Sequence, residues 1–360
     1  MQRTIPWDLK ETYAKKTWQK RVILGCGLLA VLVAFVLSLM VGSSWLSIPE
    51  SFLALFGQGT STSVRIVQAI RLPRALAALL AGAGLALAGL IMQSTLGNIM
   101  ASPSVLGVSN AAVFGANVSI IAFAGGFLST GHNIENYGTN ANPFATSAIA
   151  FVFALLSVML ILGLCRIRSF SPNTVILAGL ALGAVWTAGT TILQFYATDV
   201  GLSAAVIWSF GDLGRASFTT DAIVCAVVAA SGVFFYLFRY KYNALLGGGD
   251  VASSVGVKVD RLRFVSLLIA SLLTAVCVSF YGIIGFVGLI CPHAMRRIVG
   301  NDHRFLIPGS LISGSFLLLV ADILSRVIAN GSALPVGAIT ALLGAPFFLY
   351  LIFSRQGERP

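Results

Sequence analysis

The stretch that decides the fold is "RLPRALAALLAGAGLALAGLIMQSTL", residues 71–96. After Arg74 it continues to Leu96 without a single charged residue. A bilayer core of ~30 Å requires about 20 apolar residues in a helix. The stretch therefore predicts a membrane-spanning helix that has two arginines at its start. Its glycines, which include Gly82 and Gly89, allow neighbouring helices to approach closely.

The composition extends this prediction to the whole chain. Of its 360 residues, 57% are hydrophobic and 10% are charged, whereas soluble domains carry roughly 25% charged residues. We expect an all-α, polytopic membrane bundle. The net charge of +11 is typical of cytoplasmic loops rich in Lys and Arg, and we expect no nucleic-acid partner. The five cysteines form no CxxC pair and are interpreted as buried apolar residues.

Ten apolar segments are long enough to be candidate spans. The eighth is the weakest, because it is short and Pro292 interrupts it. The predicted spans are 22–43, 75–96, 105–126, 146–165, 174–197, 221–238, 264–281, 283–299, 306–325 and 336–353. They form a single domain over residues 22–354, between a polar N-terminal segment (1–21) and a short tail (355–360).

The distribution of positive charge sets the predicted topology. With ten spans and both termini in the cytoplasm, 18 of the 23 Lys and Arg residues lie inside and 5 outside, which obeys the positive-inside rule. Arg71, Arg74 and Arg326 are exceptions. They either anchor lipid phosphates or dock a carboxylate-bearing partner from outside, since arginine binds carboxylates bidentately.

The acidic residues argue against a self-powered carrier. Only Asp322, and marginally Asp221, lies within a predicted span, and both are near span ends. Proton-coupled carriers usually need ionisable groups near the midplane. A GxxxxGK[ST] phosphate loop is also absent. We therefore expect another subunit to supply the energy, while sodium coupling through backbone carbonyls stays open. The three scattered histidines predict no metal site, and nothing indicates an intramembrane enzyme.

The largest cytoplasmic loop covers residues 240–263. Asp250 is a candidate N-cap and Gly256 a candidate C′ residue of a short helix. A helix of under two turns is marginal by itself, so we expect it to lie against a partner; the alternative is an ordinary basic loop. The outer segment 198–220 is also predicted to hold a short helix.

Four blocks of sequence carry a family resemblance. They are "RLPRALAALLAGAGLALAGLIMQSTLGNIMASPSVLGVSNAA", "GIIGFVGLICPHAMRRIVGNDHRFLIPGSL", "ADILSR" and "LPVGAITALLGAPFFLYLI". In this order they resemble the FecCD-type permeases of ABC importers for iron–siderophore, haem and cobalamin, over residues 65–354. The resemblance implies ten spans, two paired permease subunits around a central pathway, two cytoplasmic ATPases and an external binding protein.

The resemblance also implies roles for particular residues. Pathway-lining residues are expected on the fifth and tenth spans. The implied sites are binding-protein docking (Arg71, Arg74, Arg326), a cytoplasmic gate (Asn98, Met100), ATPase coupling (Asp250, Ala252, Ser253, Gly256) and pathway lining (Thr187, Thr190, Thr191, Thr340). The chain departs from the family pattern at Ile99, where a proline is usual, and at Ala333, where a glutamate is common.

The predicted function is therefore that of an ABC importer permease subunit in the cytoplasmic membrane. The expected cargo is a metal chelate, most favourably a ferric siderophore, and cobalamin and haem are the alternative cargoes. A secondary carrier or channel is a less favoured class of protein. We expect no cofactor on this chain, since ATP and Mg would bind the partner ATPase. The sequence leaves open whether the pair is a homodimer or heterodimer, and the role of the outer loop 127–145.

Overall fold

The structure is a computed structural model that describes residues 7–42, 46–104, 106–123, 142–167, 172–328 and 334–353. In these ranges the chain forms helices and no β-strand. The long helices are α1 (Trp7–Met40), α4 (Leu72–Leu96), α7 (Pro143–Ile167), α8 (Pro172–Phe195), α10 (Phe218–Leu237), α13 (Val259–Tyr281), α15 (His303–Ile328) and α16 (Val336–Phe353). The shorter elements are α2 (Ile48–Leu55), α3 (Ser61–Arg65), η1 (Ile66–Arg71), α5 (Val108–Asn117), η2 (Val118–Phe123), α9 (Asp199–Ser209), η5 (Leu213–Arg215), α11 (Arg239–Leu245), α12 (Gly249–Ser254) and α14 (Val287–Val299).

Each of the ten predicted spans overlaps a helical segment of the described chain, and the predicted fold class is confirmed. Seven helices of the described chain are long and apolar enough to cross a membrane. The other three spans correspond to helices outside these seven: α5 continued by η2, α14 and α16. The short helix expected in segment 198–220 is α9. Most of the outer loop 127–145, the tail 355–360 and Ala333 lie outside the described residues.

The eighth span differs from its prediction, because α14 begins at Val287 and not at residue 283. Its 13 residues extend only about 20 Å at 1.5 Å per residue, less than a bilayer core. Gly282 ends α13 with a φ of 76° and Phe286 has a φ of 65°, so the chain between them leaves the helical conformation. The sequence predicted an apolar run there but could not predict this break.

Helix α4 lies at the centre of the bundle and is buried along almost its whole length. It packs against α15, α13, α14 and α10. Glycine makes two of these contacts possible: a β-carbon at Gly82 would overlap the backbone of Gly314 on α15, and one at Gly89 would overlap that of Gly288 on α14. Backbone therefore meets backbone at both sites, as predicted from the small residues.

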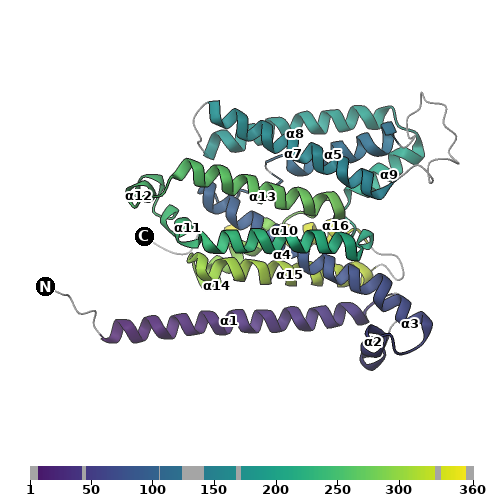
Figure 1. The fold of residues 1–360 in the computed structure, drawn as a ribbon, viewed down its shortest axis with the longest axis horizontal. Helices are drawn as coiled ribbons and strands as arrows, with labels where there is room; N and C mark the ends of the chain where they lie inside the picture. Colours follow the sequence, from purple (N-terminus) through teal and green to yellow (C-terminus); the bar gives the residue numbers. More distant parts are fainter. Residues whose placement is uncertain are drawn as a thin grey trace.

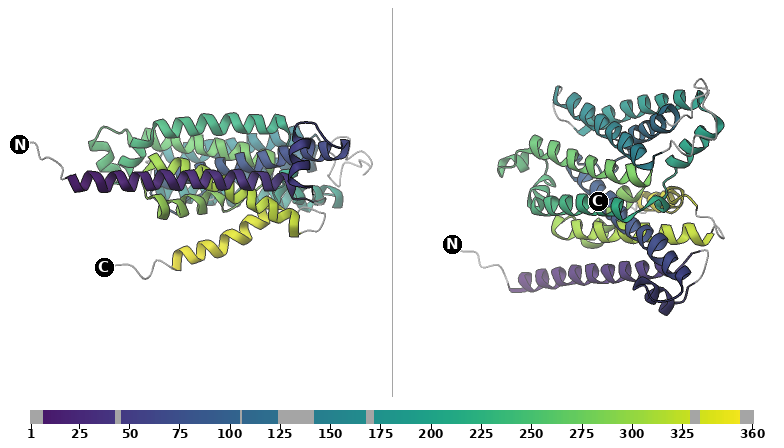
Figure 2. Two further views of the ribbon diagram at one scale, coloured as in Figure 1. Left: turned by 90° about the horizontal axis from the view of Figure 1, so that it is seen from below. Right: turned by 45° about the vertical axis from the view of Figure 1, so that its right-hand side comes forward.

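The remaining helices form layers on either side of α4, as Figure 1 shows. Helix α1 packs on α15, and α5, α7 and α8 form a group that contacts the core through α13. The elements α2, α3 and α9 lie at one end of the bundle, and α11 and α12 at the other. Figure 2 shows α16 inclined to the other helices, with Leu342 exposed on its surface.

Candidate gate and coupling sites

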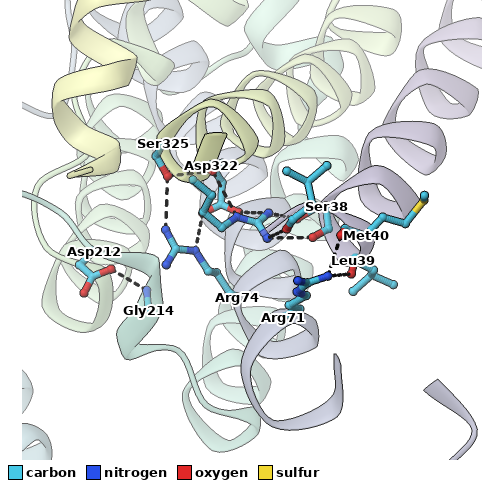
Figure 3. A network of polar contacts seen from close by, with 11 residues as sticks. Ser38, Leu39, Met40, Arg71, Arg74, Asp212, Gly214, Asp322 and Ser325 are labelled. Carbon is cyan, nitrogen blue, oxygen red and sulfur yellow. Dashed lines mark hydrogen bonds and ion pairs between the residues drawn. The ribbon is translucent and has the colours of Figure 1, made fainter. Parts of the chain in front are cut away.

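The three unusual arginines meet at the α2–α3 end of the bundle (Figure 3). The Asp322 carboxylate on α15 is completely buried between two of them. Arg74 Nε donates to Asp322 Oδ1 at 2.6 Å, and Arg326 Nη2 donates to Asp322 Oδ2 at 2.7 Å. Arg74 Nη2 also lies 3.4 Å from the Ser325 hydroxyl. One carboxylate thus ties the start of α4 to the end of α15.

The same arginines also hold the end of α1. Arg326 Nη1 donates to the carbonyls of Ser38 and Val41 at 2.9 and 2.6 Å. Arg71 Nη1 donates to the carbonyls of Leu39 and Met40 at 2.9 and 2.7 Å. The last carbonyls of a helix have no partner within the helix, and cations are favourable at this negative end of its dipole. The guanidinium groups therefore satisfy a helix terminus.

This network gives the three arginines a structural role within the chain. Arg71 is 4% exposed and Arg74 8%, and the Arg326 side chain is 9% exposed, so these guanidinium groups point into the protein. Docking of an external partner by these three residues stays a prediction. Asp322 was not predicted from the sequence as their partner, although its i, i+4 spacing to Arg326 was a visible signal.

At the opposite end lies the loop of residues 240–263, called the coupling loop below after its predicted role, and it contains the short helix α12. It begins at Gly249 with Gly248 as its N-cap, so Asp250 lies in the first turn and the prediction that it caps the helix is wrong. Gly256 does occupy the predicted C′ position, with a φ of 86°. Its N–H bonds to Ser253 O, and Val257 N–H bonds to Ala252 O, both at 3.0 Å, which is the Schellman arrangement.

Helix α12 presents a mixed face away from the bundle. Ala252 is fully buried beneath it, whereas Ser253 is exposed. The apolar neighbours Val251 and Val255 are 52% and 67% exposed. Such a short helix with an unpartnered apolar surface is what a docking element requires, which favours the coupling interpretation over an ordinary basic loop.

A polar chain connects the coupling loop to the end of α4. Asn243 on α11 accepts the backbone N–H of His303 at 2.9 Å and lies 2.8 Å from His303 Nδ1, while its amide nitrogen donates to Asp302 at 2.9 Å. The amide oxygen must therefore face His303, whose Nδ1 carries the proton. His303 Nε2 is then free to accept from the Ser94 hydroxyl on α4, 2.8 Å away.

Neighbouring groups hold this chain of hydrogen bonds in place. Burial acts to raise the pKa of Asp302, but the hydrogen bonds from Asn243 and from the Arg304 backbone outweigh it and keep that pKa below its ordinary value. Tyr242 packs beside the His303 ring, with the ring centroids 5.6 Å apart. Asp302 thus stays ionised and keeps the Asn243 amide oriented.

The far end of the coupling loop also reaches α4. Arg263 Nε donates to the Thr95 carbonyl at 3.2 Å. Directly after α4, the Asn98 side chain accepts the Met100 N–H at 2.9 Å and forms a tight turn, and the Met100 side chain is 54% exposed. The loop is thus connected to the last turn of α4, just before the predicted gate, directly through Arg263 and through His303 from Asn243. The turn forms although Ile99 stands where the family usually has a proline.

The predicted pathway threonines separate into two groups. Thr187 and Thr191 line a hollow of about 470 Å³ on the exposed side of α8, together with Asn110. Thr190 and Thr340 are buried, and their hydroxyls donate to Trp186 O and Gly337 O, each at 2.9 Å. Thr190 and Thr340 do not contribute to this hollow. In the described ranges, no group of three or more His, Cys, Asp or Glu residues could hold a metal ion.

Comparison with known proteins places this architecture in a family. The model of the FecCD transport family matches residues 29–354, and the chain belongs to that family. It is 45% identical to an ABC transporter permease protein of Methanocaldococcus jannaschii, over 96% of this chain and 98% of the relative. It is 34% identical to the iron(3+)-hydroxamate import system permease protein FhuG of Bacillus subtilis, over 94% and 98%.

A solved structure has the same fold. It is described as an inward-facing conformation of a metal-chelate type ABC transporter, and it matches with a TM-score of 0.80 at 26% identity. The match covers 93% of this chain and 99% of that one. The helical architecture is therefore that of a transport permease.

Proposed function

We propose that this chain is the permease subunit of an ABC importer that moves a metal chelate, best a ferric siderophore, across the cytoplasmic membrane. The observation that carries the proposal is the connection of both ends of the coupling loop to the last turn of α4, directly at Arg263 and through His303 at Asn243. Through Asn243 and Arg263, movement of α12 would be transmitted to Asn98 and Met100. The family membership and the names of the relatives support this class.

The proposal includes the partners that such a permease needs. A second permease subunit would complete the pathway, two ATPases would bind the α12 surfaces and supply ATP hydrolysis, and an external binding protein would deliver the chelate. Both termini would lie in the cytoplasm, consistent with the charge distribution. Cobalamin and haem are the alternative cargoes.

An uptake assay tests the cargo. The permease would be reconstituted with its ATPase and binding protein, and uptake of a ferric hydroxamate, ferric citrate, haemin and cobalamin would be compared. We expect one ferric chelate to be transported in an ATP-dependent way. Transport of cobalamin or haemin alone would replace the siderophore assignment, and uptake without ATPase would contradict the importer class.

Variants test the connection between the loop and the gate. Asn243→Ala and Arg263→Gln should leave ATP hydrolysis by the complex intact and lower uptake at least ~10-fold. The first breaks the Asn243–His303 link and the second the bond to the Thr95 carbonyl, and each loss costs about 1–3 kcal/mol. Ser254→Ala is the matched control, since its hydroxyl bonds only within α12 to Val251 O. Unchanged uptake in both test variants would refute the transmission route.

A further inference from the structure

A hollow of about 520 Å³ lies beside the coupling loop, between the end of α10 and the start of α13. Three cations line it: Lys241, Lys258 and Arg261. All three side chains are exposed, and none forms an ion pair with another described residue. No carboxylate is among the lining residues. The hollow therefore concentrates positive charge that the described part of the chain leaves unbalanced.

The other walls of the hollow are apolar. Phe234 and Phe238 on α10 stack with ring centroids 4.6 Å apart, and the Lys241 ammonium lies 4.4 Å above the Phe238 ring. On the outer side of α10, the neighbouring Val233 and Leu237 are 61% and 66% exposed. An apolar path thus leads from the cations along the membrane-facing side of α10.

Aromatic residues place the hollow at the membrane boundary. Tyr236 and Tyr240 are exposed at the end of α10 and the start of α11. Both lie against the Arg239 guanidinium, 4.4 and 4.5 Å from their ring centroids. Tyrosine and snorkelling arginine are typical of the headgroup level of a bilayer.

From these three observations we infer that the hollow binds the headgroup of an anionic phospholipid. Its phosphate lies among Lys241, Lys258 and Arg261, and one acyl chain extends along α10. Basic pockets between transmembrane helices are known recognition sites for anionic headgroups. Because Gly256 and Val257 also line the hollow, the lipid contacts the C-terminal cap of α12. Lipid charge then bears directly on the coupling helix.

Native mass spectrometry of the purified full-length chain tests the inference. The probes are dioleoyl phosphatidylglycerol, dioleoyl phosphatidylcholine with the same acyl chains, and inorganic phosphate as competitor. We expect one phosphatidylglycerol per chain to be retained in preference to phosphatidylcholine. The combined variant Lys241→Gln, Lys258→Gln, Arg261→Gln should bind it on the order of 100-fold more weakly at low salt, since each cation near the surface contributes about fivefold.

A matched control removes the same charge elsewhere. Lys15→Gln, Lys16→Gln and Arg21→Gln on α1 alter three exposed cations distant in the chain, and affinity should change by less than about threefold. The single variant Arg261→Gln should weaken binding about fivefold and provides the answer if the triple variant is unstable.

Three results would overturn the inference. Equal lipid retention by the triple variant and the parent would show that the three cations do not bind the headgroup. Displacement of the lipid by an equal concentration of phosphate would make the hollow a site for the free anion. Loss of ATPase affinity in the triple variant, with lipid retention unchanged, would make this surface a protein contact.

Discussion

Replacing Asp322 with asparagine tests whether the arginine network is structural. The substitution keeps the shape of the side chain and removes the only carboxylate that pairs with Arg74 and Arg326 in the described structure. Asp322 is fully buried, and breaking one partner of a buried ion pair costs about 3–5 kcal/mol. The amide oxygen still accepts one hydrogen bond, so we expect about 3 kcal/mol of destabilisation.

Thermal unfolding of the purified chain in detergent, without any partner protein, measures this loss. At ~2 °C per kcal/mol for a chain of this size, Asp322→Asn should lower the unfolding midpoint by roughly 6 °C. The control is Asp260→Asn, because Asp260 is exposed and substitutions at such positions usually stay within about 0.5 kcal/mol. Its midpoint should move by about 1 °C or less.

The result also separates the two accounts of the arginines. If Asp322→Asn melts at the parent temperature, the carboxylate does not hold Arg74 and Arg326, and the structural explanation fails. Docking to an external protein would then be the better reason for cations on that side. A loss of stability in the absence of any partner cannot come from docking.

Three other perturbations test the remaining assignments. Ser253→Pro should leave membrane insertion intact and lower uptake at least ~10-fold, because proline breaks α12. The control Ser253→Ala should transport normally. Normal uptake in the proline variant would count against a coupling helix. Arg71→Glu should weaken the affinity of the external binding protein for the permease in nanodiscs at low salt. The loss should be smaller at 1 M salt, where the Debye length is ~3 Å. If the variant binds as tightly as the parent at low salt, the docking prediction is wrong. Gly89→Ala should destabilise the chain by about 1–3 kcal/mol through its clash with the Gly288 backbone, whereas Gly163→Ala meets no neighbour and should not; equal melting of the two variants would refute the close contact.

Most of the helix positions could be predicted from the sequence, because length and apolarity alone determine which segments can span a bilayer. The start of the eighth span could not, since it depends on a junction of two loops with the first turn of α16. There a β-carbon at Gly211 would overlap the Ile283 carbonyl, and one at Gly337 would lie 2.5 Å from that carbonyl and from Phe210 O. Only the tertiary arrangement reveals such a junction.

The candidate site shows the same division between local and distant contacts. The cap at Gly256 was predictable, because a left-handed residue after a short helix favours glycine. The contact of Ser94 with His303 joins residues 209 positions apart, and that of Arg74 with Asp322 joins residues 248 apart. No pattern in a single sequence specifies pairings of this kind. The resemblance indicated which segments matter but not which side chains connect them.

The connections at its two ends make α4 a rigid link across the bundle. At 1.5 Å per residue its 25 residues extend about 37 Å. One end is tied to α15 through Asp322, and the other is held by Arg263 and the His303 chain. Between them, Gly82 and Gly89 bring α4 into backbone contact with α15 and α14.

Close-packed helices in backbone contact resist bending, because any local shift would create overlap or a void. If α12 moves the last turn of α4 as proposed, through Arg263 and the His303 chain, we expect the displacement to be carried along the whole helix, together with α14 and α15. We then expect the arginine network and the predicted gate to respond to the same movement. A change at Asp322 should for this reason alter transport as well as stability, even though it lies at the opposite end of α4 from Met100.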